Sequence, residues 1–172
     1  KRNKMIGVAL VIIVLLFGII TVKFIQYEKI IEDTERTWLI TQYGPRDVNS
    51  MFYTLYGGKG QLIVVDGGWT EDADFVRQTI KEMGGKVDAW ILTHPHQDHI
   101  GAFNAIYSDL QGIEIKEVYT VDMPSPKLCQ ERAHWDSVDT YNDFLVFFVK
   151  NLKYVYPGDD LNICGLKVDI YN

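Results

Sequence analysis

Three of the four histidines of this 172-residue chain lie in the stretch "ILTHPHQDHIGA", residues 91–102. His94, His96, Asp98 and His99 place four metal-binding side chains within six consecutive positions. Neutral imidazole and carboxylate are ligands of zinc, and also of iron or manganese. The alternative, a surface loop rich in histidine by chance, is disfavoured because residue types, spacing and position behind an apolar run agree. The stretch therefore predicts a metal site.

The local conformation suggests how the four side chains divide. Pro95 disfavours the helical conformation at His94, so the stretch is expected to be extended. Side chains alternate along an extended chain, which puts His94, His96 and Asp98 on one side and His99 on the other. Four donors so close in sequence are hard to wrap around a single tetrahedral ion. We expect two ions about 3.5–4 Å apart, with His94 and His96 on one ion and Asp98 and His99 on the other.

Alternating strands and helices are expected to position this loop. The apolar run "VDAWILT", residues 87–93, is typical of a strand buried on both faces, and open α/β sheets place their sites at the carboxyl ends of such strands. The glycines of "GGKG", residues 57–60, suit a hairpin turn, and Thr70 is expected to cap a helix that ends at Gly84 and Gly85. The pattern predicts an α/β layered fold. Expected strands are 37–44, 50–56, 61–68, 87–93, 113–121 and 165–172, and expected helices are 70–83, about 99–109 and 137–152.

The first part of the chain has the composition of a membrane anchor. A basic tail, residues 1–4, precedes 18 uncharged residues, 5–22, which as a helix would be roughly 27 Å long. We expect residues 5–25 to be a transmembrane signal anchor, 26–36 a polar linker and 37–172 the folded domain. A cleaved signal peptide is the alternative, but its apolar region would be shorter. The density of basic residues before the span favours a cytoplasmic N-terminus and an extracytoplasmic domain.

The remainder of the chain is acidic. After residue 25 it carries 13 basic and 23 acidic residues, a net charge of −10. General nucleic-acid binding needs clustered lysine and arginine, so this composition disfavours it, and a polyanionic substrate would have to be held by metal or by a local patch. Cys129 and Cys164 are too few for a disulfide scaffold, and we expect two independent side chains, with a pair outside the cell as the alternative.

Two motifs resemble those of the metallo-β-lactamase superfamily. "THPHQDH" resembles its His-x-His-x-Asp-His signature, and "VVDGG", residues 64–68, resembles the strand-end Asp-Gly-Gly that precedes it. The resemblance implies an αββα sandwich that binds two zinc ions, with manganese or iron as alternatives. It also implies that Asp66 supports the metal loop by hydrogen bonding without ligating, and that Gly67, Gly68 and Gly101 give structural support. His134 lies outside both motifs and is expected to be a surface or capping histidine, with a ligand as the less favoured alternative.

A closer resemblance is to the extracellular hydrolase domain of the bacterial competence DNA-uptake channel and its membrane-anchored relatives. It covers residues 37–172, where "LIVVDGG", "THPHQDHIGAF", "IKEVYTVDMPS", "YNDFL" and "YPGDDLNICGLKVDIYN" occur in the same order. The family's later motifs, with a bridging aspartate and a further histidine, have no counterpart up to Asn172. We therefore expect the N-terminal half of the sandwich, inactive by itself, with one face of its sheet exposed as an apolar patch.

The expected function is that of a membrane-anchored, metal-dependent hydrolase using a metal-bound hydroxide, in which Asp98 both ligates and orients the nucleophile. The expected substrate is a small or wall-attached phosphodiester or DNA, with a lactam or ester as the runner-up. A non-catalytic surface binding domain is disfavoured, because a structural zinc site is usually closed by four Cys or His ligands. A diiron oxidoreductase is disfavoured by His96, where those relatives carry glutamate. The expected location is the plasma membrane, in a single pass, with the lipid bilayer and no stable protein as partner.

Overall fold

A computed structural model describes residues 15–30, 37–44, 51–122, 125–138, 144, 146 and 148–171. The chain divides into two units, residues 1–37 and 38–172. In the first unit, residues 15–30 form a helix with exposed side chains. Within the described residues, no helix combines the length and apolar character that a membrane crossing needs. Residues 1–14 and 31–36 lie outside the described part, so the expected anchor over 5–25 is not supported there and stays a prediction.

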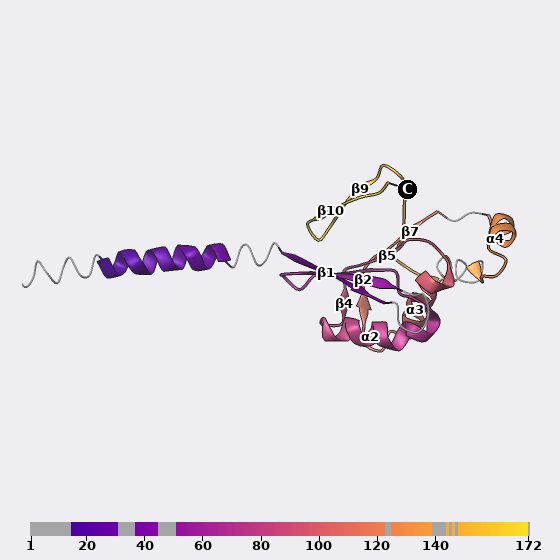
Figure 1. The fold of residues 1–172 in the computed structure, drawn as a ribbon, viewed down its shortest axis with the longest axis horizontal. Coiled ribbons are helices and arrows are strands. Elements are labelled where there is room, and N and C mark those ends of the chain that lie inside the picture. Colours follow the sequence, from indigo (N-terminus) through magenta and orange to yellow (C-terminus); the bar gives the residue numbers. More distant parts are fainter. Residues whose placement is uncertain are drawn as a thin grey trace, which may run out of the picture. The chain divides into compact units, whose positions relative to one another are not determined.

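The second unit is built on one six-stranded sheet, whose order is β1-β2-β3-β5-β7-β8 (Figure 1). The first three strands form an antiparallel meander, and β3, β5, β7 and β8 run parallel. The expected hairpin turn is confirmed, because the Gly57 amide donates to the Gln61 carbonyl at 2.8 Å. The strands are β1 (Trp38–Tyr43), β2 (Phe52–Gly57), β3 (Leu62–Val65), β5 (Ala89–Leu92), β7 (Val118–Val121) and β8 (Leu152–Val155).

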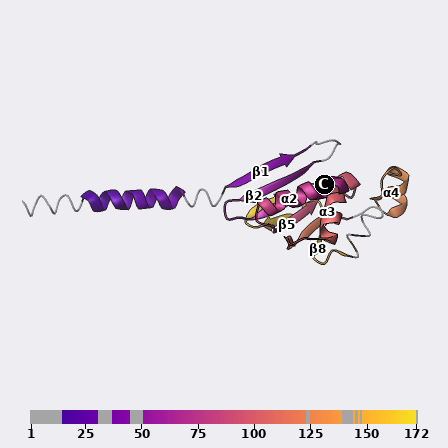
Figure 2. The same cartoon turned by 90° about the horizontal axis from the view of Figure 1, so that it is seen from below.

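Helices cover one face of this sheet (Figures 1 and 2). A 3-10 turn η1 (Thr70–Asp72) and helix α2 (Ala73–Glu82) connect β3 to β5, and helix α3 (Gln97–Ser108) leads from β5 toward β7. The core between helices and sheet is apolar and fully buried, with the rings of Trp90 and Phe103 edge to face at 5.0 Å. These crossovers between parallel strands confirm the α/β fold predicted from the sequence.

The other face of the sheet, expected to be an exposed apolar patch, is partly covered, although Ile40 of β1 remains 64% exposed. A hairpin of β9 (Asp160–Ile163) and β10 (Leu166–Asp169) lies on that side of the sheet (Figure 1). Ile163 and its neighbours pack against Ile63, Ala89 and Tyr119. Ile63 and Ala89 are fully buried as a result. The covered part of this face was not predicted, because the sequence gives no sign that the hairpin folds back onto the sheet.

Several element bounds also differ from the expectation. Residues 113–121 form two short strands, of which β6 (Glu114–Ile115) pairs with β4 (Lys86–Val87) outside the main sheet. Between β6 and β7, the Lys116 ammonium pairs with the Asp88 carboxylate. Helix α4 (Pro126–Arg132) was not expected, although Ser125 before Pro126 is a helix-start signal. Of the expected helix 137–152, residues 139–143, 145 and 147 lie outside the described part, and β8 begins at Leu152.

The helical stretch that leads into α2 starts one residue away from the prediction, because Trp69 and not Thr70 occupies the capping position. The Asp72 carboxylate accepts the Trp69 amide at 3.1 Å, and Thr70 is the first residue of the 3-10 turn η1. The predicted end at the two glycines is confirmed. Gly84 and Gly85 both have positive φ, and the Gly85 amide donates to the Ile80 carbonyl at 2.9 Å.

Candidate metal centre

The histidine-rich stretch leaves the carboxyl end of β5 and turns into α3. His96 is still extended, with φ −66° and ψ 144°, and it precedes the first helical residue, Gln97. Asp98 and His99 therefore lie on the first turn of α3. The expected alternation holds only as far as His96, because Pro95 restricts the residue before it and not those that follow.

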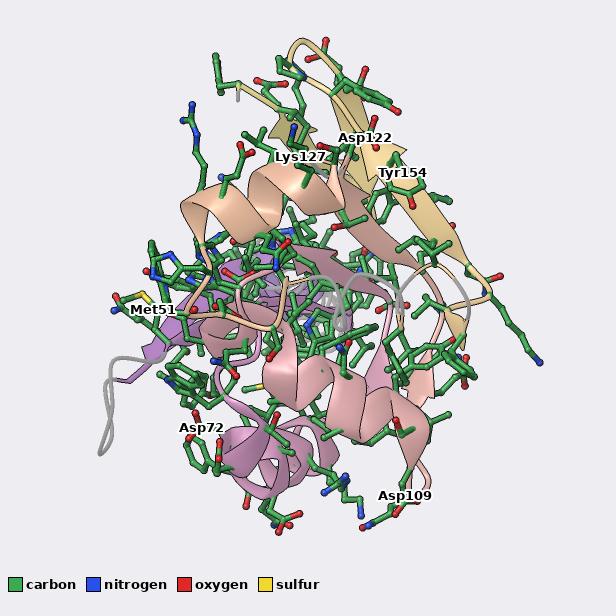
Figure 3. All side chains as sticks on the ribbon, turned by 90° about the vertical axis from the view of Figure 1, so that its right-hand side faces the viewer. Met51, Asp72, Asp109, Asp122, Lys127 and Tyr154 are labelled. Carbon is green, nitrogen blue, oxygen red and sulfur yellow. The ribbon has the colours of Figure 1, made fainter. Side chains whose placement is uncertain are left out.

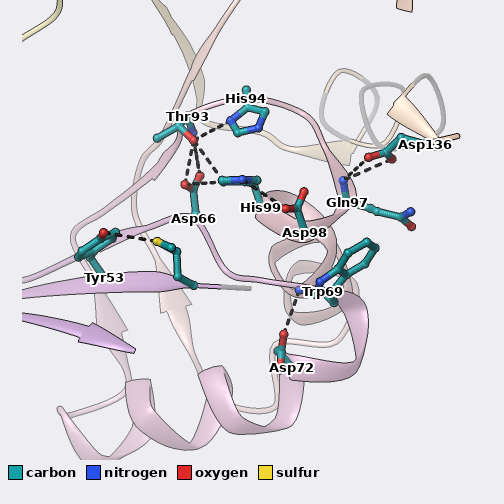
Figure 4. Close-up of polar contacts among 11 residues, drawn as sticks. Tyr53, Asp66, Trp69, Asp72, Thr93, His94, Gln97, Asp98, His99 and Asp136 are labelled. Carbon is teal, nitrogen blue, oxygen red and sulfur yellow. Dashed lines mark hydrogen bonds and ion pairs between the residues drawn. The ribbon is translucent and has the colours of Figure 1, made fainter. Parts of the chain in front are cut away.

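Asp66, directly after β3, ties this loop to the sheet (Figure 4). Its buried carboxylate accepts the Thr93 amide at 2.9 Å and the Thr93 hydroxyl at 2.8 Å. The same carboxylate lies 2.8 Å from His99 Nδ1. Its backbone is held too, since the Asp66 carbonyl accepts Trp90 Nε1 at 2.8 Å and its φ is +56°. The hydrogen bonds implied by the family resemblance are therefore present.

These contacts assign the tautomers of two histidines. A carboxylate only accepts, so His99 donates from Nδ1 to Asp66 and its Nε2 is left with a lone pair. The Thr93 hydroxyl uses its one hydrogen on Asp66, so at 3.1 Å it accepts from His94 Nδ1. His94 Nε2 is then also free to ligate. An acidic or hydroxyl partner on the other ring nitrogen is the usual support of a metal-bound histidine.

Burial and neighbouring charges shift two of the imidazoles in opposite directions. Burial lowers the pKa of His94, and the adjacent rings of His99 and His96 lower it further. Burial by itself would lower the pKa of His99 as well, but the hydrogen bond to Asp66 and the attraction of its charge raise it overall. Of these two imidazoles, His94 is the one whose neutral, ligating form the surroundings favour.

Close packing of α3 against the loop after β3 explains three glycines. A Cβ on Gly101 would lie 2.6 Å from the Thr70 backbone nitrogen, and one on Gly67 would lie 3.2 Å from the Phe103 nitrogen. Gly68 has φ +87°, and its carbonyl accepts the Ala102 amide at 3.0 Å. All three predicted support positions therefore bring α3 to the backbone beside Asp66.

The potential ligands fall into two overlapping groups. On the Asp66 side, the rings of His94 and His99 are 3.8 Å apart between centroids. On the other side, the donor atoms of His96, Asp98 and Asp136 all lie within 4.8 Å of one another. Asp98 also approaches His99, with 3.6 Å between its Oδ2 and His99 Nε2. The two predicted pairs are also close, since the rings of His94 and His96 are 4.8 Å apart between centroids, and the division of the ligands between two ions stays a prediction.

Asp136 was not predicted, and the histidine beside it does not join the site. His134 is exposed, and its ring packs against Trp135 at 5.0 Å. Asp136 lies 37 residues after His99, in a segment without a recognisable motif. The one sequence signal that pointed to this segment was the single histidine in "ERAHWDS". Cys164, which the sequence analysis considered for a disulfide, lies in the β9–β10 turn, where it is exposed and unpaired.

The donor set fits a zinc-type ion. Three imidazoles and the carboxylates of Asp98 and Asp136 converge on one end of the sheet, and zinc binds imidazole and carboxylate in catalytic sites. Manganese and iron accept the same donors. The donors are partly buried, not sealed, so a ligand from solution can reach them.

A pocket of about 420 Å³ opens beside His94 and His96. It lies between the metal loop, the end of β7 and the segment that begins with α4, the region marked by Asp122 and Lys127 in Figure 3. Its walls are mainly apolar, and its charged residues are Asp122 and Arg132. The lining residues are His94, Pro95, His96, Val121, Asp122, Leu128, Arg132, Ala133 and Val138.

Comparison with known proteins agrees with this geometry. Residues 43–128 match the family model of the metallo-beta-lactamase superfamily. The chain belongs to this superfamily. Hydroxyacylglutathione hydrolase from Aliivibrio fischeri (strain MJ11) is 28% identical over 121 residues, which are 68% of this chain and 46% of the relative. The corresponding enzyme of Photobacterium profundum is 28% identical over 131 residues, 74% of this chain and 50% of the relative. This chain thus spans about half the length of the curated relatives that it matches.

Among solved structures, a metallo-beta-lactamase from Staphylococcus aureus subsp. aureus COL has a similar fold. Its TM-score is 0.51 at 13% identity, with 79% of this chain and 34% of that chain covered. This likeness concerns the fold alone. The ligand roles of His94, His96, Asp98 and His99 stay predictions, and so does the closer resemblance to the competence-channel domain.

Proposed function

We propose that the protein is a metal-dependent hydrolase of a compact substrate whose apolar part occupies the pocket beside His94 and His96. The observation that carries the proposal is the position of the pocket. Two members of the potential ligand cluster, His94 and His96, line one end of an apolar pocket of about 420 Å³. Pockets of this kind, mainly apolar with a few converging polar groups, are typical of small-molecule sites.

A bound zinc ion supplies a water whose pKa is lowered to about 7, and so a nucleophile at neutral pH. The residues of the chain hold and orient the reactants. Asp66 and Thr93 keep Nε2 of His94 and His99 available for ligation. Asp98, with 30% of its side chain exposed, has a second carboxylate oxygen that accepts a hydrogen bond from the attacking water and so orients it. The apolar walls of the pocket exclude bulk water from the bound substrate.

The charge of the site favours a compact substrate over a nucleic-acid strand. Asp98 and Asp136 lie in the ligand cluster, and Asp122 lines the pocket, where Arg132 is the basic residue. Carboxylates around the entrance repel a chain of phosphates, which binds by neutralisation with lysine and arginine. An acyl group or a single anionic group is compatible with both the apolar wall and Arg132.

We propose a carboxylic ester or a thioester as the bond that is cleaved. The pocket suits an acyl group, and the relatives named above are called hydroxyacylglutathione hydrolases. A phosphodiester, the choice favoured by the sequence, is the second candidate. It is supported by the number of donors, which suffices for two ions, and a pair of ions suits attack on phosphorus by holding both attacking and leaving oxygens.

We further propose that the hydrolase is anchored in the plasma membrane by residues 5–25, with its site on the extracytoplasmic side. The uncharged run of residues 5–22 and the basic residues before it support this proposal. A substrate attached to the cell wall would then be within reach of the site.

The test is a parallel assay of the full-length protein, loaded with zinc or with manganese, on a p-nitrophenyl ester, a thioester, bis(p-nitrophenyl) phosphate, single-stranded DNA and a chromogenic lactam. Turnover of the ester or thioester is expected. Turnover of the phosphodiester alone would move the second candidate to first place. Metal binding without any turnover would support the surface binding domain instead.

A matched pair of variants tests the pocket. Leu128 lines it and is 39% exposed, whereas Leu110, 37% exposed, follows α3 and is not among the lining residues. Leu128→Ser is expected to raise KM several-fold at an unchanged metal content, because it removes apolar contact with the substrate. Leu110→Ser is expected to leave KM unchanged. Equal kinetics in both variants would contradict the pocket as the substrate site.

A further inference from the structure

Arg132 brings a positive charge to the pocket beside His94 and His96. Of the described residues that line this pocket, it is the one lysine or arginine. It is the last residue of α4, and Leu128, another lining residue, lies four positions before it on the same face of the helix. One face of α4 therefore offers the substrate site an apolar side chain and a cation together.

The Arg132 guanidinium has no protein partner in the part of the chain that the structure describes. No ion pair or hydrogen bond there involves it. Its neighbour Glu131 lies 4.0 Å from Lys127, the α4 residue labelled in Figure 3, and these two lie on a different face of the helix. The acid next to Arg132 in the sequence is thus directed to another cation. The N–H donors of the guanidinium are left for a ligand in the pocket.

We propose that Arg132 is a specificity-determining residue that binds a carboxylate carried by the substrate at a distance from the bond that is cleaved. The proposal rests on the proposed function, because it takes this pocket as the substrate site. The planar guanidinium presents paired N–H donors that match the two oxygens of a carboxylate. The substrate class is then an ester or a thioester whose acyl part carries an apolar spacer and a terminal carboxylate.

The charges and the size of the pocket favour a short chain with a single negative charge. Arg132 supplies one positive charge, and the carboxylate of Asp122 on the same lining repels a second negative charge. The apolar lining, to which Val121 and Leu128 contribute, suits the methylene groups of a spacer. The volume of about 420 Å³ lies toward the lower end of the range of about 300–1,000 Å³ that is typical of small-molecule sites.

A structural role for Arg132 at the end of α4 is the competing explanation. A cation in the last turn of a helix is favourable, because it lies near carbonyl oxygens that have no partner within the helix. Such a role would change the stability of α4 and would affect all substrates alike. Anion binding by the guanidinium would instead change the discrimination between a charged substrate and a neutral one of the same length.

The experiment uses the full-length, zinc-loaded protein and two p-nitrophenyl esters, the mono-ester of adipate and the ester of hexanoate. Their acyl chains have the same length and differ in a terminal carboxylate or methyl group. Arg132→Gln is compared with Lys127→Gln, which removes the same charge from another face of the same helix. Because Arg132 is exposed and its charge is screened by solvent, we expect Arg132→Gln to raise KM for the adipate ester by about 5- to 10-fold. KM for the hexanoate ester, and both values in Lys127→Gln, should stay at the wild-type level.

A binding measurement without turnover separates this proposal from the proposed function. Adipamate and hexanamide differ in the same way as the two esters and carry an amide in place of the ester, so calorimetry can compare their affinities in the same proteins. Wild type should prefer adipamate, Arg132→Gln should lose this preference, and Arg132→Lys should restore part of it. Such a result without any ester hydrolysis would support the carboxylate site and contradict the proposed hydrolase. A preference that persists in Arg132→Gln, or is absent from the wild type, would overturn the assignment of Arg132 and leave the proposed function intact.

Discussion

The support that Asp66 gives to the metal loop can be tested by Asp66→Asn. Asparagine tolerates the left-handed backbone of this position, φ +56°, so the variant changes the side chain without backbone strain. Its oxygen can still accept the Thr93 amide, but its NH₂ group then faces His99 Nδ1, where the carboxylate oxygen lies at 2.8 Å. His99 can relieve the conflict only by moving its proton to Nε2, the atom needed for ligation.

The size of the effect follows from the hydrogen bond that is lost. A hydrogen bond to a charged group contributes about 1.5–3 kcal/mol. At 1.36 kcal/mol per decade, this corresponds to a loss of about 10- to 150-fold in metal affinity. Substitution of a residue that supports a metal ligand in this way typically lowers metal affinity by about 10- to 100-fold, which agrees with this range. The free energy of unfolding of the metal-free variant should fall by about 1–3 kcal/mol.

Asp88→Asn is the matched control. Asp88 is also a buried carboxylate beside β5, but it lies at the opposite end of the strand, where it accepts the Leu62 amide at 3.0 Å and pairs with Lys116. Both variants should lose stability in urea unfolding, and only Asp66→Asn should lose zinc affinity in competition with a chromophoric chelator. A folded Asp66→Asn variant with wild-type zinc affinity would refute the tautomer argument.

Three further predictions concern the site, the packing and the anchor. His96→Ala should remove at least one metal ion per chain in elemental analysis, whereas His134→Ala, at an exposed histidine, should retain the wild-type content. Gly101→Ala should lower the free energy of unfolding by about 1–3 kcal/mol, because the new Cβ would lie 2.6 Å from the Thr70 nitrogen; an unchanged denaturation midpoint would contradict this close contact. If residues 5–25 span the membrane with the N-terminus inside, protease added to intact cells should digest the chain after Thr34, and protection until lysis would indicate the reverse orientation.

The parts of the fold that local patterns specify could be predicted from the sequence. The run before Thr93 is apolar because β5 is buried in the sheet, and the glycines after β2 and α2 lie in turns. The start of α3 was placed two residues late, because the extended conformation that Pro95 imposes was carried too far along the chain. Asp98 follows the extended stretch directly, and an acidic residue at such a position indicates the first turn of a helix, so the earlier start could have been predicted.

The remaining features depend on contacts between distant segments. The break between β6 and β7 lies in an alternating stretch that looks continuous, and Lys116 in this break pairs with Asp88, 28 residues earlier. The hairpin of β9 and β10 covers the sheet through Ile163, which no local pattern could place. Asp136 joins His96 only because the segment after β7 turns back toward α3. Single-sequence patterns describe neighbours along the chain, and these contacts are between residues far apart in it.

The bonds from Asp66 to Thr93 and His99 also bear on the order of events in folding. They join residues 27 and 33 positions apart, at the ends of two parallel strands that need a helical crossover before they can pair. Such non-local pairing carries a loop-closure cost and is slow compared with a hairpin such as β2–β3. The ligand loop therefore acquires its geometry only after β3 and β5 have met, late on the folding route. An ion that binds this geometry would act on the unfolding rate, prolonging the lifetime of the native state without hastening its formation.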